Sequence, residues 1–314
     1  MHLIEKCLFI GNGLNRCLKN SISWGKLLEN IASDLEVSYC NDTPMPMEFE
    51  RMANEYMAAN PENKENVHDI MKKTICERLN NVKLPPNAIH YKLSSLPLNA
   101  IITTNYDFLL EYIFNPEFNS ISGNKKYLFD KTSIQKGIAF YHAHGSANQS
   151  KSLCLGYEHY MGIVQKLRTE LNTKENNKKE NMEIYKILSG ESGRKDTWGE
   201  RFYTSNISFI GFELNECEAD IWWLLTHRAY LFYSNYCGVK SHLNNRIIFY
   251  DILDYKSNSN SDEEKKRIYR NKKIMRHRLL EKENVLVRSY NIGKDCSSYE
   301  EAYEKIIDDI RKEE

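Results

Sequence analysis

The chain has 314 residues, which is enough for one large domain or two small ones with a substantial core. Its 43 Lys and Arg residues balance 43 Asp and Glu residues, so no global basic field draws the protein to nucleic acid. No apolar run approaches the roughly 18 residues of a membrane-spanning helix, and the N-terminus has no cleavable signal pattern. We therefore expect a soluble, cytoplasmic protein that does not enter a membrane.

The eight cysteines are scattered along the chain, and no two of them have the C-x-x-C spacing of a structural zinc site. Several lie in apolar runs, which is typical of reduced thiols in a hydrophobic core. The sequence therefore predicts no metal site.

The first predicted element is a buried strand at residues 7–10, which ends at Gly11 and Gly13. Two glycines one residue apart let a ligand approach the backbone, as in the phosphate-binding turns of α/β folds. The third glycine of the full dinucleotide fingerprint is replaced by Arg16, and the only acid near the ribose position, Asp34, lies inside a helical pattern. An ordinary dehydrogenase is thus disfavoured, and a simple strand-to-helix turn stays open as the alternative.

A helical pattern follows at residues 24–35, with Ser23 placed to cap its N-terminus. Two more helical patterns, at 47–57 and 67–79, lie between proline-containing breaks. We interpret residues 41–95 as a helical insertion over the sheet.

Strands and helices then alternate to the end of the chain. We expect further strands at 100–102, 140–144, 206–210, 246–253 and 285–290. The last helix, 299–310, has the clearest apolar periodicity. This alternation predicts an α/β fold, a Rossmann-like and mostly parallel sheet of about six strands with helices on both faces.

The remaining segments are polar or irregular. Residues 120–137 are expected to form a hairpin or loop, and 257–283 a loop followed by an exposed helix. Residues 147–204 are interpreted as a variable insertion, with a helix near 157–167 and a charged, mobile loop at 169–180. We treat residues 1–314 as a single domain.

Four of the predicted strands end in polar or glycine-containing turns, at Gly11, Thr103, His144 and Gly211. Ligands of open parallel sheets bind at the carboxyl ends of the strands, so these turns are expected to share one cleft. His144 is the only group at its strand end that titrates near neutral pH.

Asn105 and Asp107 lie two residues apart in the turn after the second strand, so their side chains can point the same way. Each could instead cap the following helix, and His144 could be an ordinary core histidine.

Together these segments resemble a family. Gly11-Asn12-Gly13, Thr103-Thr104-Asn105-Tyr106-Asp107, His144-Gly145-Ser146 and Gly211-Phe212-Glu213 look like the ordered motifs of sirtuin-like NAD-consuming domains. Ser23-Trp24 resembles the corresponding residues in one branch of this family, which is found in bacterial anti-phage defence systems. In that branch the domain hydrolyses NAD. The resemblance spans roughly residues 3–292. The paired cysteines of the sirtuin zinc ribbon are absent, which disfavours lysine deacylation.

The resemblance implies two catalytic residues. Asn105 would hold a water beside the ribose, and His144 would act as a general base or hold a ribose hydroxyl. Asp107 would bind the carboxamide or the ribose, and backbone N–H groups between Gly11 and Asn15 would hold the pyrophosphate.

The cofactor-binding residues that the resemblance implies are Gly11, Asn12, Gly13, Asn15, Ser23, Trp24, Thr103, Thr104, Asp107, Gly145, Gly211, Phe212 and Glu213. Asn15 and Glu213 stand where the family commonly has serine. Because a carboxylate would repel a phosphate, we expect Glu213 to accept hydrogen bonds from the adenosine ribose.

The function so implied is an NAD glycohydrolase with NAD as its substrate, acting as a gated effector in anti-phage defence. A partner protein or a nucleotide signal encoded nearby, or self-assembly, is expected to activate it in a homo-oligomer or hetero-complex. A non-catalytic module that binds NAD or ADP-ribose is the main alternative, and a protein deacylase or ADP-ribosyltransferase is a further one.

Overall fold

The computed structural model describes residues 4–63, 66–82, 84–119, 128–171, 182–191, 193, 195–234, 236–255 and 263–313. Much of the predicted hairpin or loop at 120–137 and most of the charged loop predicted at 169–180 lie outside these residues.

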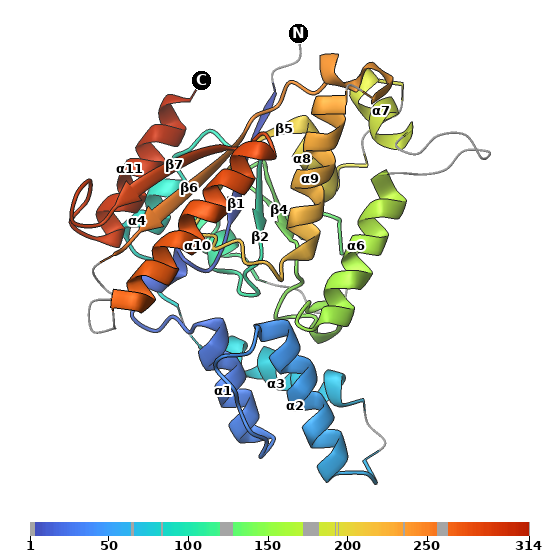
Figure 1. The fold of residues 1–314 in the computed structure, drawn as a ribbon, viewed down its shortest axis with the longest axis vertical. Helices are drawn as coiled ribbons and strands as arrows, with labels where there is room; N and C mark the ends of the chain where they lie inside the picture. The colour runs from blue at the N-terminus through green and yellow to red at the C-terminus, as the bar shows by residue number, and fades with distance from the viewer. Residues whose placement is uncertain are drawn as a thin grey trace.

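A seven-stranded sheet forms the centre of the molecule, in the order β3-β4-β2-β1-β5-β6-β7 (Figure 1). The strands are β1 (Glu5–Ile10), β2 (Ala100–Thr103), β3 (Ser133–Gln135), β4 (Ile138–His142), β5 (Ser205–Ile210), β6 (Ile247–Leu253) and β7 (Leu286–Asn291). All neighbours pair in parallel except β3, which pairs with β4 in an antiparallel hairpin. The predicted Rossmann-like, mostly parallel sheet is confirmed. The additional strand is the three-residue β3, which is too short to show a periodic pattern.

The six parallel strands have the doubly wound order, in which the chain steps outward from β1 to β2 and β4 and then crosses to β5, β6 and β7. In register, Cys7 of β1 faces Ala100 of β2 on one side and Ile207 of β5 on the other. The topological switch point therefore lies between β1 and β5, and ligands of such sheets bind beside it.

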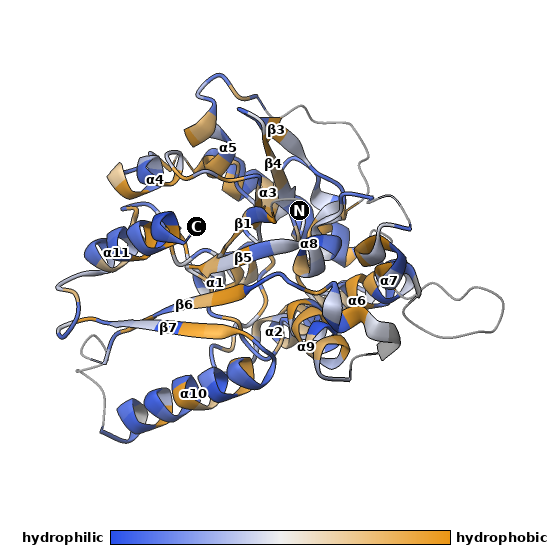
Figure 2. Cartoon of the chain, turned by 90° about the horizontal axis from the view of Figure 1, so that it is seen from above, coloured by the Kyte–Doolittle hydropathy of each residue, from blue (hydrophilic) through white to orange (hydrophobic). Residues whose placement is uncertain are grey.

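Helices cover both faces of the sheet (Figure 2). One face packs against α6 (Tyr157–Leu171), α7 (Met182–Ser189), α8 (Trp198–Thr204), α9 (Ala219–Ser234) and α10 (Glu263–Lys282). The other packs against α4 (Ala88–Leu93), α5 (Leu109–Phe114) and α11 (Tyr299–Lys312). The inner strands β2 and β4 are buried throughout and appear in the sequence as mostly apolar runs, whereas the edge strand β7 is largely exposed.

Three helices form a separate cluster at the carboxyl end of the sheet, at the bottom of Figure 1. They are α1 (Trp24–Asp34), α2 (Met45–Ala59) and α3 (Val67–Asn81). Ser23 caps α1 as predicted, since its hydroxyl accepts a hydrogen bond from the Lys26 N–H. The cluster differs from the expected insertion at 41–95, because α1 belongs to it while α4 packs against α11 and α5.

The turns after β1 and β5 contact each other directly through their glycines. The N–H of Gly11 donates to the Ile210 carbonyl, and that of Gly13 to the Gly211 carbonyl, at 3.0 and 2.7 Å. A Cβ atom on Gly11 would lie 2.5 Å from the Gly211 carbonyl oxygen, and Gly211 has a φ of +61°. Close approach of the two backbones explains these glycines, and it occupies two of the N–H groups that the sequence assigned to a pyrophosphate.

We expect Gly11→Ala to destabilise the fold by about 1–3 kcal/mol, because the added methyl group overpacks a contact between two backbones. Urea unfolding would measure this change. Gly162→Ala is the matched control: its Cβ would meet no described atom within 4 Å, and alanine favours the interior of α6 by about 1 kcal/mol. An unchanged urea midpoint for Gly11→Ala would contradict the packing argument.

Candidate functional site

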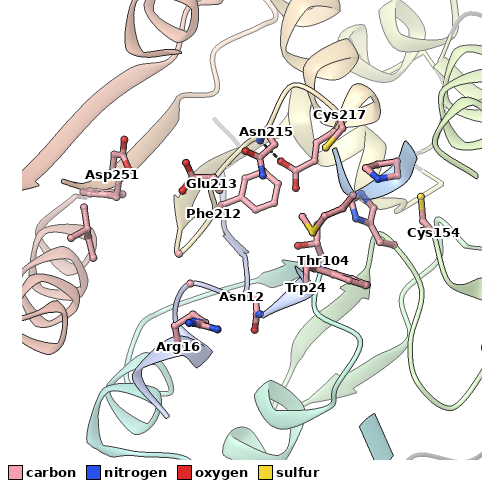
Figure 3. A pocket seen from close by; sticks show the side chains of 18 of the residues that line it. Asn12, Arg16, Trp24, Thr104, Cys154, Phe212, Glu213, Asn215, Cys217 and Asp251 are labelled. Atoms are coloured by element: carbon pink, nitrogen blue, oxygen red, sulfur yellow. Dashed lines mark hydrogen bonds between the residues drawn. The ribbon is translucent and has the colours of Figure 1, made fainter. Parts of the chain in front are cut away.

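A cavity of about 530 Å³ lies at the carboxyl ends of β1, β2, β4, β5 and β6 and is also lined by residues of α1 and α2. Figure 3 shows it with Asp251 towards one end and Cys154 towards the other. Of the predicted residues, it is lined by Asn12, Gly13, Trp24, Thr104, His144, Gly211, Phe212 and Glu213. The predicted turns thus meet at one cavity at the switch point.

A second, smaller hollow of about 50 Å³ adjoins the cavity. Asn12, Trp24 and Thr104 line both spaces, and Ser23, Asn105 and Asp107 line only the smaller one. The two proposed catalytic residues therefore face neighbouring hollows that share a wall.

Four predicted residues line neither hollow: Gly11, Asn15, Thr103 and Gly145. The Thr103 hydroxyl donates to the Ile10 carbonyl at 2.8 Å and accepts the Asn105 N–H at 3.0 Å, so it fixes the turn. A Cβ on Gly145, whose φ is +89°, would lie 2.2 Å from the Ser152 carbonyl oxygen. The hydrogen bonds of Thr103 and the close packing of Gly145 against Ser152 hold the loops that carry the residues lining the cavity.

Asn15 is buried and points into the protein. Its amide nitrogen donates to the Asp107 carboxylate at 3.1 Å, and its amide oxygen lies 3.3 Å from the Nε2 of His90. The other Asp107 oxygen accepts the Leu109 N–H at 3.0 Å, so Asp107 contacts the first turn of α5 from one residue before the N-cap position, Phe108. Burial raises the pKa of Asp107, while this N–H partly opposes the shift.

The backbone of Asn105 is hydrogen-bonded on both sides, whereas its side-chain amide is unpaired within the residues that the structure describes. The Asn105 carbonyl accepts a hydrogen bond from His142 Nδ1 at 2.8 Å, and His142 Nε2 lies 3.0 Å from Glu111. Only 6% of Asn105 is exposed, yet neither atom of its amide finds a hydrogen-bond partner among the described residues. Leaving such a group unpaired costs about 1–3 kcal/mol, so the amide is arranged for something other than stability.

The His142 and Glu111 pair supports Asn105 from below. Burial lowers the pKa of His142, but the Glu111 carboxylate, the Asn105 carbonyl and Asp107 together raise it overall. The hydrogen bond from His142 Nδ1 fixes the Asn105 carbonyl in place.

His144 is paired with an acid that the sequence analysis did not assign to the site. Its Nε2 lies 2.9 Å from Asp220 Oδ2, and both side chains are buried. Burial lowers the pKa of His144, but Asp220 and, less strongly, Glu218 together more than compensate, so the pKa is raised. An N–H directed at Asp220 leaves Nδ1 of the neutral ring as the proton acceptor, a tautomer that we assign from this hydrogen bond.

Sequence patterns place Asp220 only in the first turn of α9, where an acid suits the helix dipole. Its second oxygen, Oδ1, has no partner within the described part of the chain. The neighbouring Glu218 lines the cavity, accepts the Asn215 N–H at 2.6 Å, and has its pKa raised to about 8 by burial.

The opposite end of the cavity is lined by Glu213, Asp251 and Lys273. Asp251 lies 3.0 Å from Lys273 and 2.9 Å from Arg276, and Glu213 lies 3.0 Å from Arg276. Burial would raise the pKa of Asp251, but the His277 hydrogen bond and the cations lower it to about 2. Glu213 is therefore charge-compensated. Asp251 lies near the carboxyl end of the predicted strand 246–253, and this position could have marked it as a candidate site residue.

Fold and site define an α/β protein with a Rossmann-like sheet and a ligand-sized cavity at its switch point. Residues 99–218 match the family model described as a SIR2-like domain, and this range includes Asn105, His144 and Gly211. The chain thus contains a sirtuin-like domain, which confirms that part of the resemblance and fits an NAD-related activity. No curated protein matches the chain.

No helix among the described residues is long and apolar enough to cross a membrane. No group of three His, Cys, Asp or Glu side chains in the same residues could hold a metal ion.

Proposed function

We propose that the protein hydrolyses NAD at the bond between nicotinamide and ribose, giving nicotinamide and ADP-ribose. The observation that carries this proposal is the buried Asn105 amide beside the main cavity, whose two polar atoms have no hydrogen-bond partner in the described part of the chain. The SIR2-like match over the same turn supports NAD as the substrate.

The chemistry requires little acid catalysis. The C–N bond breaks with its electron pair passing to nicotinamide, which leaves as a neutral molecule from a positively charged pyridinium. The ribose then has oxocarbenium character, as in glycoside hydrolysis. A water adds its oxygen to the anomeric carbon and loses a proton. The Asn105 amide would orient this water, and neutral His144 would accept the proton at Nδ1.

The proposed setting is cytoplasmic anti-phage defence, in which depletion of NAD stops an infected cell. An unregulated hydrolase would deplete its own host. We therefore propose that a partner protein or a nucleotide signal switches the enzyme on, within a homo-oligomer or a hetero-complex.

Incubation of the purified chain with NAD, alone and with co-expressed neighbouring gene products, tests the proposal. We expect nicotinamide and ADP-ribose to appear in equal amounts without any acyl-lysine acceptor. NAD binding without turnover in every context would favour the non-catalytic module instead, and nicotinamide release that requires an acyl-lysine peptide would indicate a deacylase.

A further inference from the structure

Helix α10 exposes several apolar side chains and buries two charged ones, although Leu280 is buried and most of its charged residues are exposed. Ile268, Met275 and Leu279 are 58%, 55% and 51% exposed, whereas Lys273 and Arg276 are buried. A helix that only covers a sheet has the reverse arrangement. Figure 2 shows α10 at the periphery, beyond the edge strand β7.

Three of the exposed apolar residues form one stripe, and the less exposed Ile274 lies outside it. Spacings of seven and four residues place Ile268, Met275 and Leu279 on the same side of the helix, with Lys272 between them. We call these four residues the α10 stripe. Such spacing is that of a helix that pairs with another helix.

The charge around the stripe indicates the kind of partner. Helix α10 contains nine Lys or Arg residues and three Glu residues. Glu263 and Glu264 pair with Lys266 and Arg267 at its N-terminus. No ion pair joins Lys272, Arg278 or Lys282 to a carboxylate of the described residues.

We propose that the α10 stripe is a docking surface for an acidic amphipathic helix of a partner protein. The apolar side of such a helix would cover Ile268, Met275 and Leu279, and its carboxylates would pair with Lys272 and the flanking cations. A second copy of α10 would instead bring like charges together. Helix α11 of a second copy offers acids but keeps its apolar face inside its own core.

The inner face of α10 connects this surface with the cavity. Lys273 and Arg276 hold Asp251 and Glu213, which line it. A partner on the outer face would therefore lie one helix away from the cavity wall. Binding can be measured without any reaction, so the inference stands or fails independently of NAD hydrolysis.

The test uses the whole chain and a synthetic helical peptide with a leucine stripe flanked by glutamates, followed by fluorescence anisotropy. We expect binding that weakens in high salt and weakens at least tenfold in the double variant Ile268→Ser, Met275→Ser. Met161→Ser, which changes an exposed methionine of α6, is the matched control and should bind like the wild type.

Four results would overturn the proposal. The first is equal binding of a matched peptide with lysines in place of the glutamates. The second is binding of phosphatidylserine vesicles but not of the acidic peptide, which would indicate a membrane surface. The third is absence of peptide binding by a wild-type chain whose circular dichroism shows it folded. The fourth is unchanged binding by the folded double variant.

Discussion

Nicotinamide release should fall at least about 10²-fold in Asn105→Ala, while the free energy of unfolding stays within about 1 kcal/mol of the wild-type value. Activity should fall because the amide that would orient the water is gone. Stability should be kept because the amide makes no hydrogen bond with the described protein. Product chromatography and urea unfolding of the same preparation would measure both effects.

Asn245 provides the matched control, because it is an equally buried asparagine whose amide is fully used. It accepts from Arg228 and donates to the carbonyls of Phe202 and Ser205. Asn245→Ala should therefore destabilise the fold by about 1–3 kcal/mol or more, with the remaining folded enzyme active. The catalytic assignment of Asn105 would be wrong if its alanine variant kept the wild-type rate of release.

The sequence predicted the sheet well because parallel strands carry a strong local signal. Strands β2, β4 and β6 are short runs that are mostly apolar because both of their faces are buried, whereas the edge strand β7 is largely exposed and shows a weaker apolar pattern. It also predicted that the turns after these strands meet, since topology brings carboxyl ends to one edge. Which helices cluster together depends on long-range packing, so the grouping of α1 with α2 and α3 carried no local signal.

The direction in which side chains point was the second feature that the sequence could not predict. Asn15 lies in the right loop but points to Asp107 and His90, and Thr103 points back to the Ile10 carbonyl. A motif fixes the backbone position of such residues and leaves open which side of the loop they face. The sequence also contained no sign that Asp220 is the acid partner of His144, because the two residues lie 76 positions apart in the chain.

His144→Ala should abolish nicotinamide release, and Asp220→Asn should reduce it roughly 10²-fold while changing how the rate depends on pH. If neutral His144 accepts the proton, the rate rises with pH through the pKa of His144. Asp220 raises that pKa in the wild type. Without the carboxylate the pKa falls, so the acidic limb of the rate profile should move to lower pH in Asp220→Asn.

The pH dependence of the free energy of unfolding provides a second test of the pairing between His144 and Asp220. Since the folded pKa of His144 is raised, the charged pair with Asp220 stabilises the fold most at low pH, and this contribution is lost as pH rises through that pKa. Asp220→Asn should therefore lose more unfolding free energy at pH 6 than at pH 9. A variant that is slower at every pH, with an unmoved acidic limb and a pH-independent loss of stability, would mean that Asp220 only packs against His144. The imidazole would then titrate independently of its neighbour, and the assignment of Nδ1 as the proton acceptor would lose its basis.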